Sequence, residues 1–490
     1  MLTATPGSGS SRLRTPAPTD SIDSAASPNA ARSDASEAVS LRDRLLSRGI
    51  RPVVADSVAV ARIIFGLIIA WGAIRFLARG WVDTLYLDPA NHLTYASFEW
   101  VRPLPAPWMH LVVIAIAGLG LCMAAGYRHR LSSSAFLIAF TYTELIEASL
   151  YLNHYWFLTL MAVTQLLLPV QHRWSLDARA GRVRASSTVP VMAVWVLRAQ
   201  LAVVYLFAGL AKLNPDWLLH AQPLELWFAD RADEPLIGSV LSQPTSAYVA
   251  SWAAALFDLT IVGWLLWRRT TRWAYLALVV FHLATGWLFQ IGLFHWVMIL
   301  MTLVFFEPDW PRRWLGRFPG SRQSTRPFRR ATPAAAPLAI RRPMLLALGF
   351  FAVVQVVLPL RHFAYPSNVR WSEEGYYLSW RVMLTDKAGL VTYRVTDPSS
   401  ERSWEAGPEL VLEDWQQSHA ATRPDLIVAS AKLIAEHYAD AGLTDVEVRA
   451  DAWVSFNGGR AERLVDPTID LASVDRGLSA KSWILDEPQR

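Results

Sequence analysis

The sequence predicts a polytopic α-helical membrane protein that carries a C-terminal α+β domain outside the membrane. Hydrophobic residues make up 53% of the 490 positions and the mean hydropathy is positive. Several apolar runs approach the length that a helix needs to cross a bilayer. After residue 362 the charge rises and apolar residues begin to alternate. We therefore expect a disordered tail over 1–45, a membrane domain over 46–362 and an exterior, β-rich α+β domain over 363–490.

Nine apolar segments are candidate membrane spans. They cover residues 58–78, 108–126, 132–151, 155–171, 189–213, 246–267, 273–290, 292–306 and 343–362. With the N-terminus inside, the interior loops carry 18 Lys and Arg and the exterior loops carry three. This asymmetry follows the positive-inside rule, so we expect a cytoplasmic N-terminus and a C-terminal domain on the exterior side.

The N-terminal tail and the exterior domain have contrasting patterns. The tail is rich in Ser, Ala, Pro and Thr and has no apolar signal-peptide core, so the first span is expected to act as an uncleaved anchor. In the exterior domain, alternation over 375–384 and 446–456 predicts strands of a mostly antiparallel sheet. Between them we expect a helix with Thr422 as its N-cap and Gly442 just after its end.

Composition and motifs exclude several classes of protein. The formal charge of +5 comes with basic residues in short loops between apolar runs, where they set membrane topology, so we expect no nucleic-acid partner. Cys122 is the only cysteine, so the chain can form no internal disulfide and we expect no metal site. The chain also lacks a P-loop, a Gly-rich dinucleotide fingerprint, an HExxH motif and a GxSxG motif.

Lys212 is the strongest candidate for chemistry. It lies at the exterior edge of the fifth span, and it is one of only four lysines among 46 Lys and Arg. Loss of water there favours the neutral amine, which can accept a proton, whereas a guanidinium cannot do so near neutral pH. The alternative interpretation is a lysine that extends to the lipid headgroups and takes part in no reaction.

Other polar residues at membrane depth are functional candidates because burying them in a bilayer is costly. Asn153 and His154 lie in a short exterior turn, at the same membrane face as Lys212, so all three can converge on one pocket. The alternative for each candidate is a satisfied buried group, for example an ion pair between Arg198 and Glu147. The further candidates are Arg62, Arg75, Glu144, Glu147, Gln165, Arg198, Asp258, His282 and Gln290.

The segment AGLAKLNPDW (208–217) resembles the signature of vitamin K-dependent γ-glutamyl carboxylases and of the related bacterial HTTM (horizontally transferred transmembrane domain) proteins. Other similar segments follow in the same order along the chain. They are VRPLPAPWMHLV (101–112), LNHYW (152–156), FDLTIVGWLL (257–266), FHLATGWLFQIGLF (281–294), WSEEGYYLSWRVML (371–384), DAWVSFNGG (451–459) and LVDPTIDL (464–471). The resemblance therefore extends from about residue 45 to the C-terminus.

The resemblance implies an enzyme that couples two reactions. Reduced vitamin K, or another quinol, is deprotonated by the active-site lysine and reacts with O2. The strongly basic product of that step removes a γ-proton from a peptidyl glutamate, which then adds CO2 while the quinone leaves as its epoxide. By position, Lys212 matches the base, and Asn153 and His154 match the pair that holds the hydroquinone. Expected partners are the lipid bilayer and a secreted Glu-containing peptide or protein.

Further site residues are assigned with less direct support. Tyr376, Trp380 and Arg381 lie in the segment that resembles the family's glutamate-binding side. Among the polar residues of the spans, we also assign Asp258 and His282 to the cofactor site. The chain departs from the animal enzymes at Ala211, where they have a second lysine.

Three functions are consistent with these observations. The first is the coupled quinol oxygenation and glutamate carboxylation described above. The second is a quinol-modifying membrane oxidoreductase that carboxylates no glutamate. The third is a non-catalytic membrane scaffold or transporter with the same fold.

Overall fold

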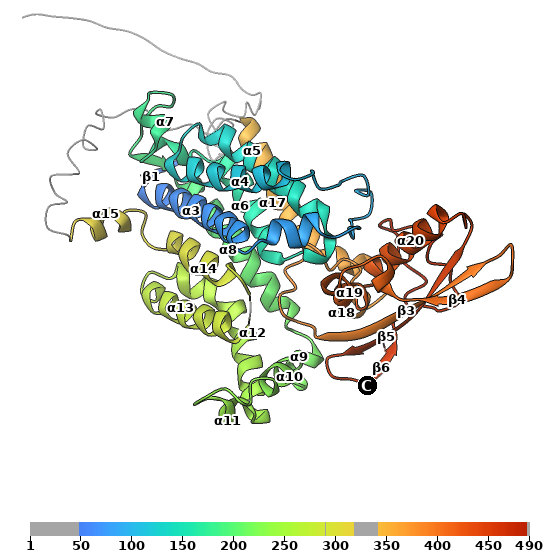
Figure 1. Cartoon of the computed structure of the whole chain (residues 1–490). Helices are drawn as coiled ribbons and strands as arrows, with labels where there is room; N and C mark the ends of the chain where they lie inside the picture. The colour runs from blue at the N-terminus through green and yellow to red at the C-terminus, as the bar shows by residue number, and fades with distance from the viewer. Residues whose placement is uncertain (1–48, 290, 318–341, 488–490) are drawn as a thin grey trace, which may run out of the picture. The chain divides into compact units, whose positions relative to one another are not determined.

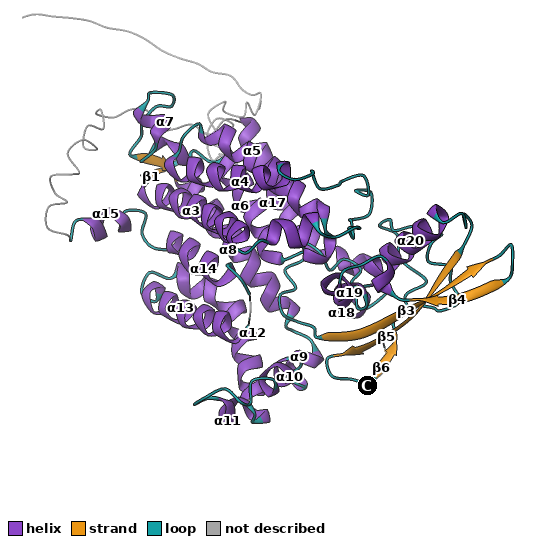
Figure 2. Cartoon of the chain, viewed as in Figure 1, coloured by secondary structure: helices purple, strands orange, loops and turns teal. Residues whose placement is uncertain are grey.

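Long helices form the N-terminal two thirds of the described chain, and strands appear mainly after residue 386 (Figure 1, Figure 2). The computed structural model describes residues 49–289, 291–317 and 342–487. The expected tail over 1–45 and the candidate Gln290 lie outside the described residues. The chain from Ile50 onward belongs to one compact unit.

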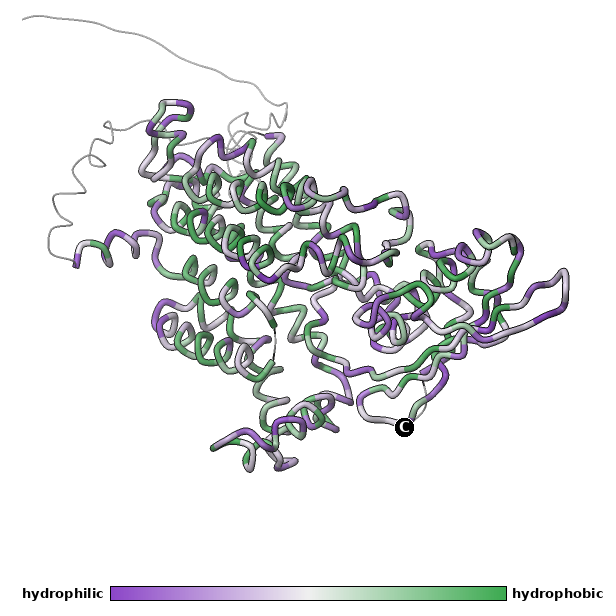
Figure 3. The backbone as a smooth tube through the Cα atoms, in the orientation of Figure 1, coloured by the Kyte–Doolittle hydropathy of each residue, from purple (hydrophilic) through white to green (hydrophobic). Residues whose placement is uncertain are grey.

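Each of the nine expected spans contains a helix. The helices are α3 (Asp56–Ala78), α4 (Trp108–Ala125), α5 (His129–Ile146), α6 (Asn153–Leu167), α8 (Val191–Ala211), α12 (Pro244–Leu266), α13 (Thr271–Leu288), α14 (Phe294–Met301) and α17 (Arg342–Leu360). Hydrophobic residues predominate along these helices (Figure 3). Short helices connect them: α7 (Leu176–Arg179), α9 (Pro215–Leu219), α10 (Leu224–Ala229), α11 (Gly238–Leu241) and α15 (Trp310–Leu315).

Five helices of the described chain are long and apolar enough to cross a membrane by length and composition, namely α3, α4, α8, α12 and α17. Such helices suit a lipid bilayer. Helix α5 has the required 18 residues but includes three serines and Glu144, while α6 and α14 are shorter than a bilayer requires. A multi-pass membrane protein is therefore supported, and the count of nine spans stays a prediction.

Helices α3 and α4 approach closely because glycines face each other where they pack. A side-chain carbon added at Gly66 would clash with backbone atoms of Gly120 and Ala124. Small residues of this kind let two helices in a membrane pack backbone against backbone. This contact fixes α3, whose C-terminal end carries Arg75 and Arg79.

The C-terminal domain contains a four-stranded antiparallel sheet in the order β4-β3-β5-β6. Its strands are β3 (Lys387–Asp397), β4 (Arg402–Ala406), β5 (Glu447–Phe456) and β6 (Ala461–Arg463), and its helices are α18 (Val369–Ser372), α19 (Asp414–Ala420) and α20 (Pro424–Asp440). In β5 every second side chain is buried, and α20 contributes Leu426 and Ile427 to the same core. The remaining strands, β1 (Pro52–Val54) and β2 (Thr188–Pro190), pair with each other. The predicted antiparallel sheet and its strand over 446–456 are confirmed.

The predicted strand over 375–384 is wrong, because this segment is an irregular loop. Gly375, Leu378 and Trp380 have φ angles of 78°, 61° and 59°, which a strand does not allow. Trp380 is fully buried and its ring lies 6.4 Å from that of Phe157 in α6. The alternation of aromatic residues therefore reflects packing against the membrane helices rather than a pleated strand.

The predicted N-cap of α20 is also wrong. The helix begins at Pro424, so Arg423 occupies the N-cap position and makes no side-chain cap. Proline suits the first helical position because the amide hydrogen it lacks would have no partner there. The Thr422 hydroxyl instead donates to the backbone oxygen of His419 at 3.4 Å. Gly442, with φ of 96°, follows the helix as predicted.

Candidate active site

Lys212 is the residue at which α8 ends. Most residues of α8 up to Ala211 are apolar, and the Asn214 side chain accepts a hydrogen bond from the Trp217 amide to begin α9. The side chain of Lys212 is only 7% exposed. Its Nζ donates to Oδ2 of Asp258, in α12, at 2.9 Å, and lies 5.2 Å from the centre of the Trp217 ring. The ammonium group is thus neither in bulk water nor in open lipid.

Lys212 lines a cavity of about 350 Å³ that we call the lysine cavity. Its walls are mostly apolar and aromatic, and its polar side chains are Tyr205, Lys212, Asp258, His282 and Thr285. The hydroxyl of Tyr205 and Nε2 of His282 lie 2.8 Å apart. The structure therefore brings Asp258 and His282 to the same cavity as Lys212.

Nζ of Lys212 and Oδ2 of Asp258 are close enough for a proton to pass directly between them. The two groups can share one proton between Nζ and Oδ2, as an ammonium with a carboxylate or as an amine with a carboxylic acid. Asp258 is therefore a second proton-holding group beside the predicted base.

Asn153 and His154 begin α6 and face a different cavity. The Asn153 amide donates to the backbone oxygen of Arg381 at 3.4 Å, and the hydroxyl of Tyr151 donates to Oδ1 of Asn153 at 3.2 Å. The cavity has a volume of about 680 Å³, and we call it the arginine cavity. Its polar and charged lining residues are Arg75, Arg79, Trp81, Tyr151, Asn153, His154, Tyr155, Tyr376, Arg381 and Arg423.

The lysine cavity and the arginine cavity adjoin but are separate. Lys212 and the Asn153–His154 pair therefore do not face the single pocket that the sequence predicted. Ile291, Phe294, Val382 and Met383 line both cavities. The ring of Phe294 lies 5.8 Å from that of His154 and 6.3 Å from that of His282. Phe294 therefore stands between the predicted cofactor residues of one cavity and those of the other.

Tyr376 and Arg381 reach the arginine cavity, whereas Trp380 does not. The Tyr376 hydroxyl donates to the backbone oxygen of Arg381 at 3.0 Å, which fixes the bend of the loop. Burial lowers the pKa of the Arg381 guanidinium to about 10, and the group remains charged at neutral pH. Trp380 lines neither described cavity and packs on Phe157.

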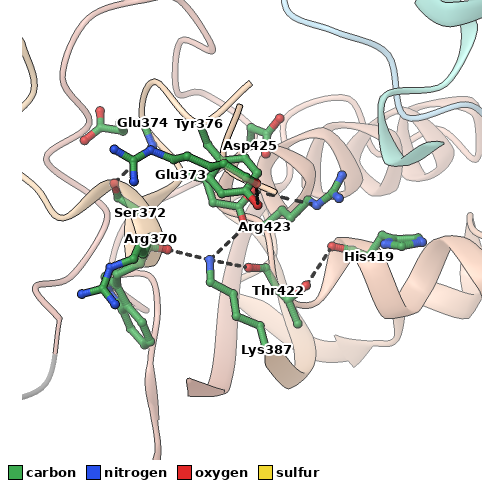
Figure 4. Close-up of polar contacts among 12 residues, drawn as sticks. Arg370, Ser372, Glu373, Glu374, Tyr376, Lys387, His419, Thr422, Arg423 and Asp425 are labelled. Atoms are coloured by element: carbon green, nitrogen blue, oxygen red, sulfur yellow. Dashed lines mark hydrogen bonds and ion pairs between the residues drawn. The ribbon is translucent and has the colours of Figure 1, made fainter. Parts of the chain in front are cut away.

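A network of polar contacts supports the C-terminal side of the arginine cavity (Figure 4). The Lys387 ammonium donates to the backbone oxygen of Trp371 at 2.8 Å and to Glu373 at 2.9 Å. Glu373 also lies 3.9 Å from the Arg423 guanidinium. Lys387 and Glu373 therefore stabilise the N-terminal end of α20. Arg423, which directly precedes this helix, extends to the cavity.

Two of the other membrane-depth candidates have structural partners. Arg62 donates to the backbone oxygens of Met123 and Trp174, at 2.7 Å each. Arg198 donates to the backbone oxygens of Val304, Phe305 and Phe306. Both guanidinium groups therefore satisfy backbone oxygen atoms of neighbouring segments.

The suggested ion pair of Arg198 with Glu147 is wrong. The Glu147 carboxylate accepts from the Leu93 amide at 3.1 Å and from the Gln416 side chain at 2.8 Å, and so joins the membrane helices to the C-terminal domain. Glu144 lines one cavity with Tyr95 and Asp425, and a smaller one of about 80 Å³ with Arg75 and His154.

Sequence reasoning missed several polar residues of the two cavities, among them Tyr205, Arg79 and Arg423. Tyr205 is seven positions before Lys212, and this helical spacing places both on one face of α8, so the signal was present. Arg79 and Arg423 gave no such signal, because one ends a helix and the other precedes a helix of a distant domain. Within the described residues, no group of three or more His, Cys, Asp and Glu side chains is arranged to hold a metal ion.

The bilayer-length helices, the polar cavities at one end of them and the antiparallel C-terminal domain define a class of protein: a polytopic membrane protein with an extramembrane α+β domain. Residues 50–310 match the HTTM domain, and the chain belongs to this family. Residues 340–490 match the lumenal domain of vitamin K-dependent gamma-carboxylase. The protein is thus gamma-carboxylase-like, with a C-terminal domain of the lumenal type. No solved structure matches the chain.

Proposed function

We propose that the protein is a membrane enzyme that couples the oxygenation of a quinol to the carboxylation of a glutamate side chain. One observation carries the proposal: the Lys212 ammonium is bonded to Asp258 at the edge of an apolar cavity, at 2.9 Å. The matches to the HTTM domain and to the gamma-carboxylase lumenal domain support the same activity. In this proposal the N-terminus is cytoplasmic, because of the loop charges, and the substrate peptide arrives from the lumenal side.

The lysine cavity fits the aromatic ring of a quinol. Its volume of about 350 Å³ lies within the usual range for small-molecule sites, and Phe257 and Phe281 contribute flat apolar walls. Lys212 and Asp258, together with the Tyr205–His282 pair, are placed to meet hydroxyl groups on such a ring. When bound, the quinol would supply a weakly acidic phenolic proton and the electrons for reaction with O2.

The proton-accepting role falls to the Lys212–Asp258 pair. Transfer of the shared proton from Nζ to Oδ2 leaves Lys212 as a neutral amine with a free lone pair. The amine can then accept a phenolic proton, and the ammonium that results stabilises negative charge left in the apolar cavity. Asp258 therefore keeps the base available without moving a net charge into the membrane.

Asn153 and His154 line the arginine cavity, next to the lysine cavity where the quinol ring is proposed to bind. We keep the prediction that they contact the quinol, across the boundary formed by Phe294 and Met383. Tyr376 and Arg381, from the C-terminal domain, line the same cavity and are the proposed contacts for an acidic substrate. Exclusion of water by the loop over 375–384 favours removal of a weakly acidic proton.

The experiment supplies the protein in nanodiscs with reduced vitamin K, O2, labelled bicarbonate and a Glu-containing peptide. We expect label in the peptide and quinone epoxide in the lipid, and we expect loss of both in Lys212→Ala. Epoxide without label would favour a quinol-modifying oxidoreductase instead. If the wild-type protein formed neither product, the result would favour the function of a non-catalytic scaffold or transporter.

A further inference from the structure

Three arginines that line the arginine cavity make no ion pair with an acidic side chain of the described chain. Arg75 and Arg79 come from the end of α3 and stack on Trp81, at 5.0 and 5.1 Å from its ring centre. Arg381 comes from the C-terminal domain and is only 8% exposed. None of the described residues that line the cavity is Asp or Glu. The cavity is therefore strongly positive.

Two of these guanidinium groups also have buried hydrogen-bond donors that nothing accepts. Nε of Arg75 and Nε of Arg381 are buried and make no hydrogen bond within the described chain. A buried donor without an acceptor costs about 1–3 kcal/mol, and more when the group is charged. The fourth arginine, Arg423, differs because Glu373 lies 3.9 Å from it. These donors are therefore placed to receive an anion with several acceptor oxygens.

The chemistry of that anion follows from geometry and charge. A guanidinium presents its donors as a planar fork, which matches the two oxygens of a carboxylate. Three cations without acidic partners exceed the charge of a single carboxylate. The volume of about 680 Å³ is also much larger than one carboxylate needs. A ligand with two carboxylates close together meets both conditions.

We propose that the arginine cavity binds a malonate-type group, in which one carbon carries two carboxylates. The inference rests on the proposed function and deepens it, because carboxylation creates this group. The Cγ–H bond of the glutamate breaks, its proton leaves to the base, and the electron pair forms a carbon–carbon bond with CO2. One oxygen of the former CO2 takes the negative charge, so the side chain gains a second carboxylate.

Arg75 and Arg381 then have a defined role in the reaction. Charge on the side chain rises from one to two as the new bond forms, and cations already fixed in place stabilise that increase. A site complementary to the dianion, rather than to the starting monoanion, lowers the barrier to its formation. Arg75 and Arg381 are therefore specificity-determining contacts of the carboxylated side chain.

Binding is measured without turnover, on the full chain in nanodiscs with no quinol present. Malonate, acetate and inorganic phosphate are titrated separately by calorimetry. We expect malonate to bind at least about tenfold more tightly than acetate or phosphate, a difference of about 1.4 kcal/mol. We expect Arg75→Gln and Arg381→Gln each to remove most of this preference for malonate. The matched control is Arg463→Gln, at a lumenal ion pair with Asp451, which should leave malonate binding unchanged.

The outcomes separate this inference from the proposed function. Equal affinity for malonate and acetate, phosphate binding as tight as malonate binding, or full preference in both arginine variants would overturn the inference. Arg75→Lys, which keeps the charge but loses the fork, should bind malonate with intermediate affinity and shows that the site is folded. Selective malonate binding by a protein that carboxylates no peptide would retain the inference and reject the proposed function.

Discussion

Lys212 and Asp258 form a buried ion pair between the end of α8 and the middle of α12, with Nζ and Oδ2 2.9 Å apart and each side chain 7% exposed. A buried ion pair often stabilises a protein less than two well-packed apolar side chains of similar size would, because both charges lose their hydration. A pair that also faces an apolar cavity therefore favours a chemical role over a purely structural one.

Asp258→Asn should slow quinol oxidation while leaving quinol binding largely intact. Asparagine has nearly the same shape as aspartate but carries no charge and cannot hold a proton. The ammonium that forms when Lys212 accepts the quinol proton therefore loses its carboxylate partner, which makes Lys212 a weaker base. We expect the rate of quinol consumption to fall by about 10²- to 10⁴-fold, the usual contribution of a general base. Quinol affinity, followed by quenching of tryptophan fluorescence, serves as the control. An unchanged rate would show that Asp258 takes no part in proton transfer.

The ion pair should be strongly coupled in stability. Lys212→Met leaves Asp258 without its partner and should destabilise the protein by about 3–5 kcal/mol. The double variant with Asp258→Leu removes both charges and should be less destabilised than either single variant. Unfolding in mixed micelles with increasing denaturant measures all three variants. Additive losses would contradict a direct interaction.

The contact between α3 and α4 should not tolerate a side chain at Gly66. Gly66→Ala brings a methyl group against the backbone of Gly120 and Ala124, and we expect a loss of about 1–3 kcal/mol from the strain. Gly118 is the matched control in α4, because no heavy atom of the described chain, apart from the nearby backbone of α4 itself, lies within 4 Å of a carbon added there. Thermal melting compares the two variants. Equal melting temperatures for Gly66→Ala and Gly118→Ala would contradict the close packing.

The protein should become less stable as the pH is lowered, because of His419 in the C-terminal domain. Burial, and then the charge of Arg423, lowers the pKa of His419 to about 4 from its ordinary value of 6.5. Between these two pH values the unfolded chain binds more protons than the folded chain, so stability decreases as pH falls through this window. We expect His419→Gln to lose less of its melting temperature between pH 7 and pH 5 than the wild-type protein does.

Asp425 provides the internal comparison for that measurement. Burial raises the pKa of its carboxyl group, so the folded chain binds the extra proton and this residue changes stability in the opposite direction. The difference between wild type and His419→Gln at each pH isolates the histidine, since Asp425 is present in both. If the melting temperatures of the wild-type protein and of His419→Gln changed equally with pH, His419 would not be buried as a neutral ring.

The helical elements could be predicted because long apolar runs are a local property of the sequence. All nine expected segments contain helices, and the strand over 446–456 follows from alternation that matches one buried face. The segment over 375–384 could not be predicted in the same way. Its aromatic residues pack on helices that lie more than 200 positions earlier, and several of its residues adopt positive φ angles.

The candidate site was only partly predictable. Loop charges predict that Lys212, Asn153 and His154 lie at one membrane face. In the structure Lys212 and His154 are buried and Asn153 is half-buried. Their division between two adjoining cavities depends on Phe294, whose position is set by tertiary packing. The arginine cavity combines α3 with the C-terminal domain, and no local pattern signals such a combination.

The central claim is that the Lys212 amine accepts a proton from a quinol. The most direct test is the rate of quinone epoxide formation by Lys212→Ala in nanodiscs with reduced vitamin K and O2, with Lys432→Ala in α20 as the lysine control. We predict loss of epoxide formation in Lys212→Ala and a wild-type rate in Lys432→Ala. Epoxide formation at the wild-type rate in Lys212→Ala would contradict the proposed mechanism.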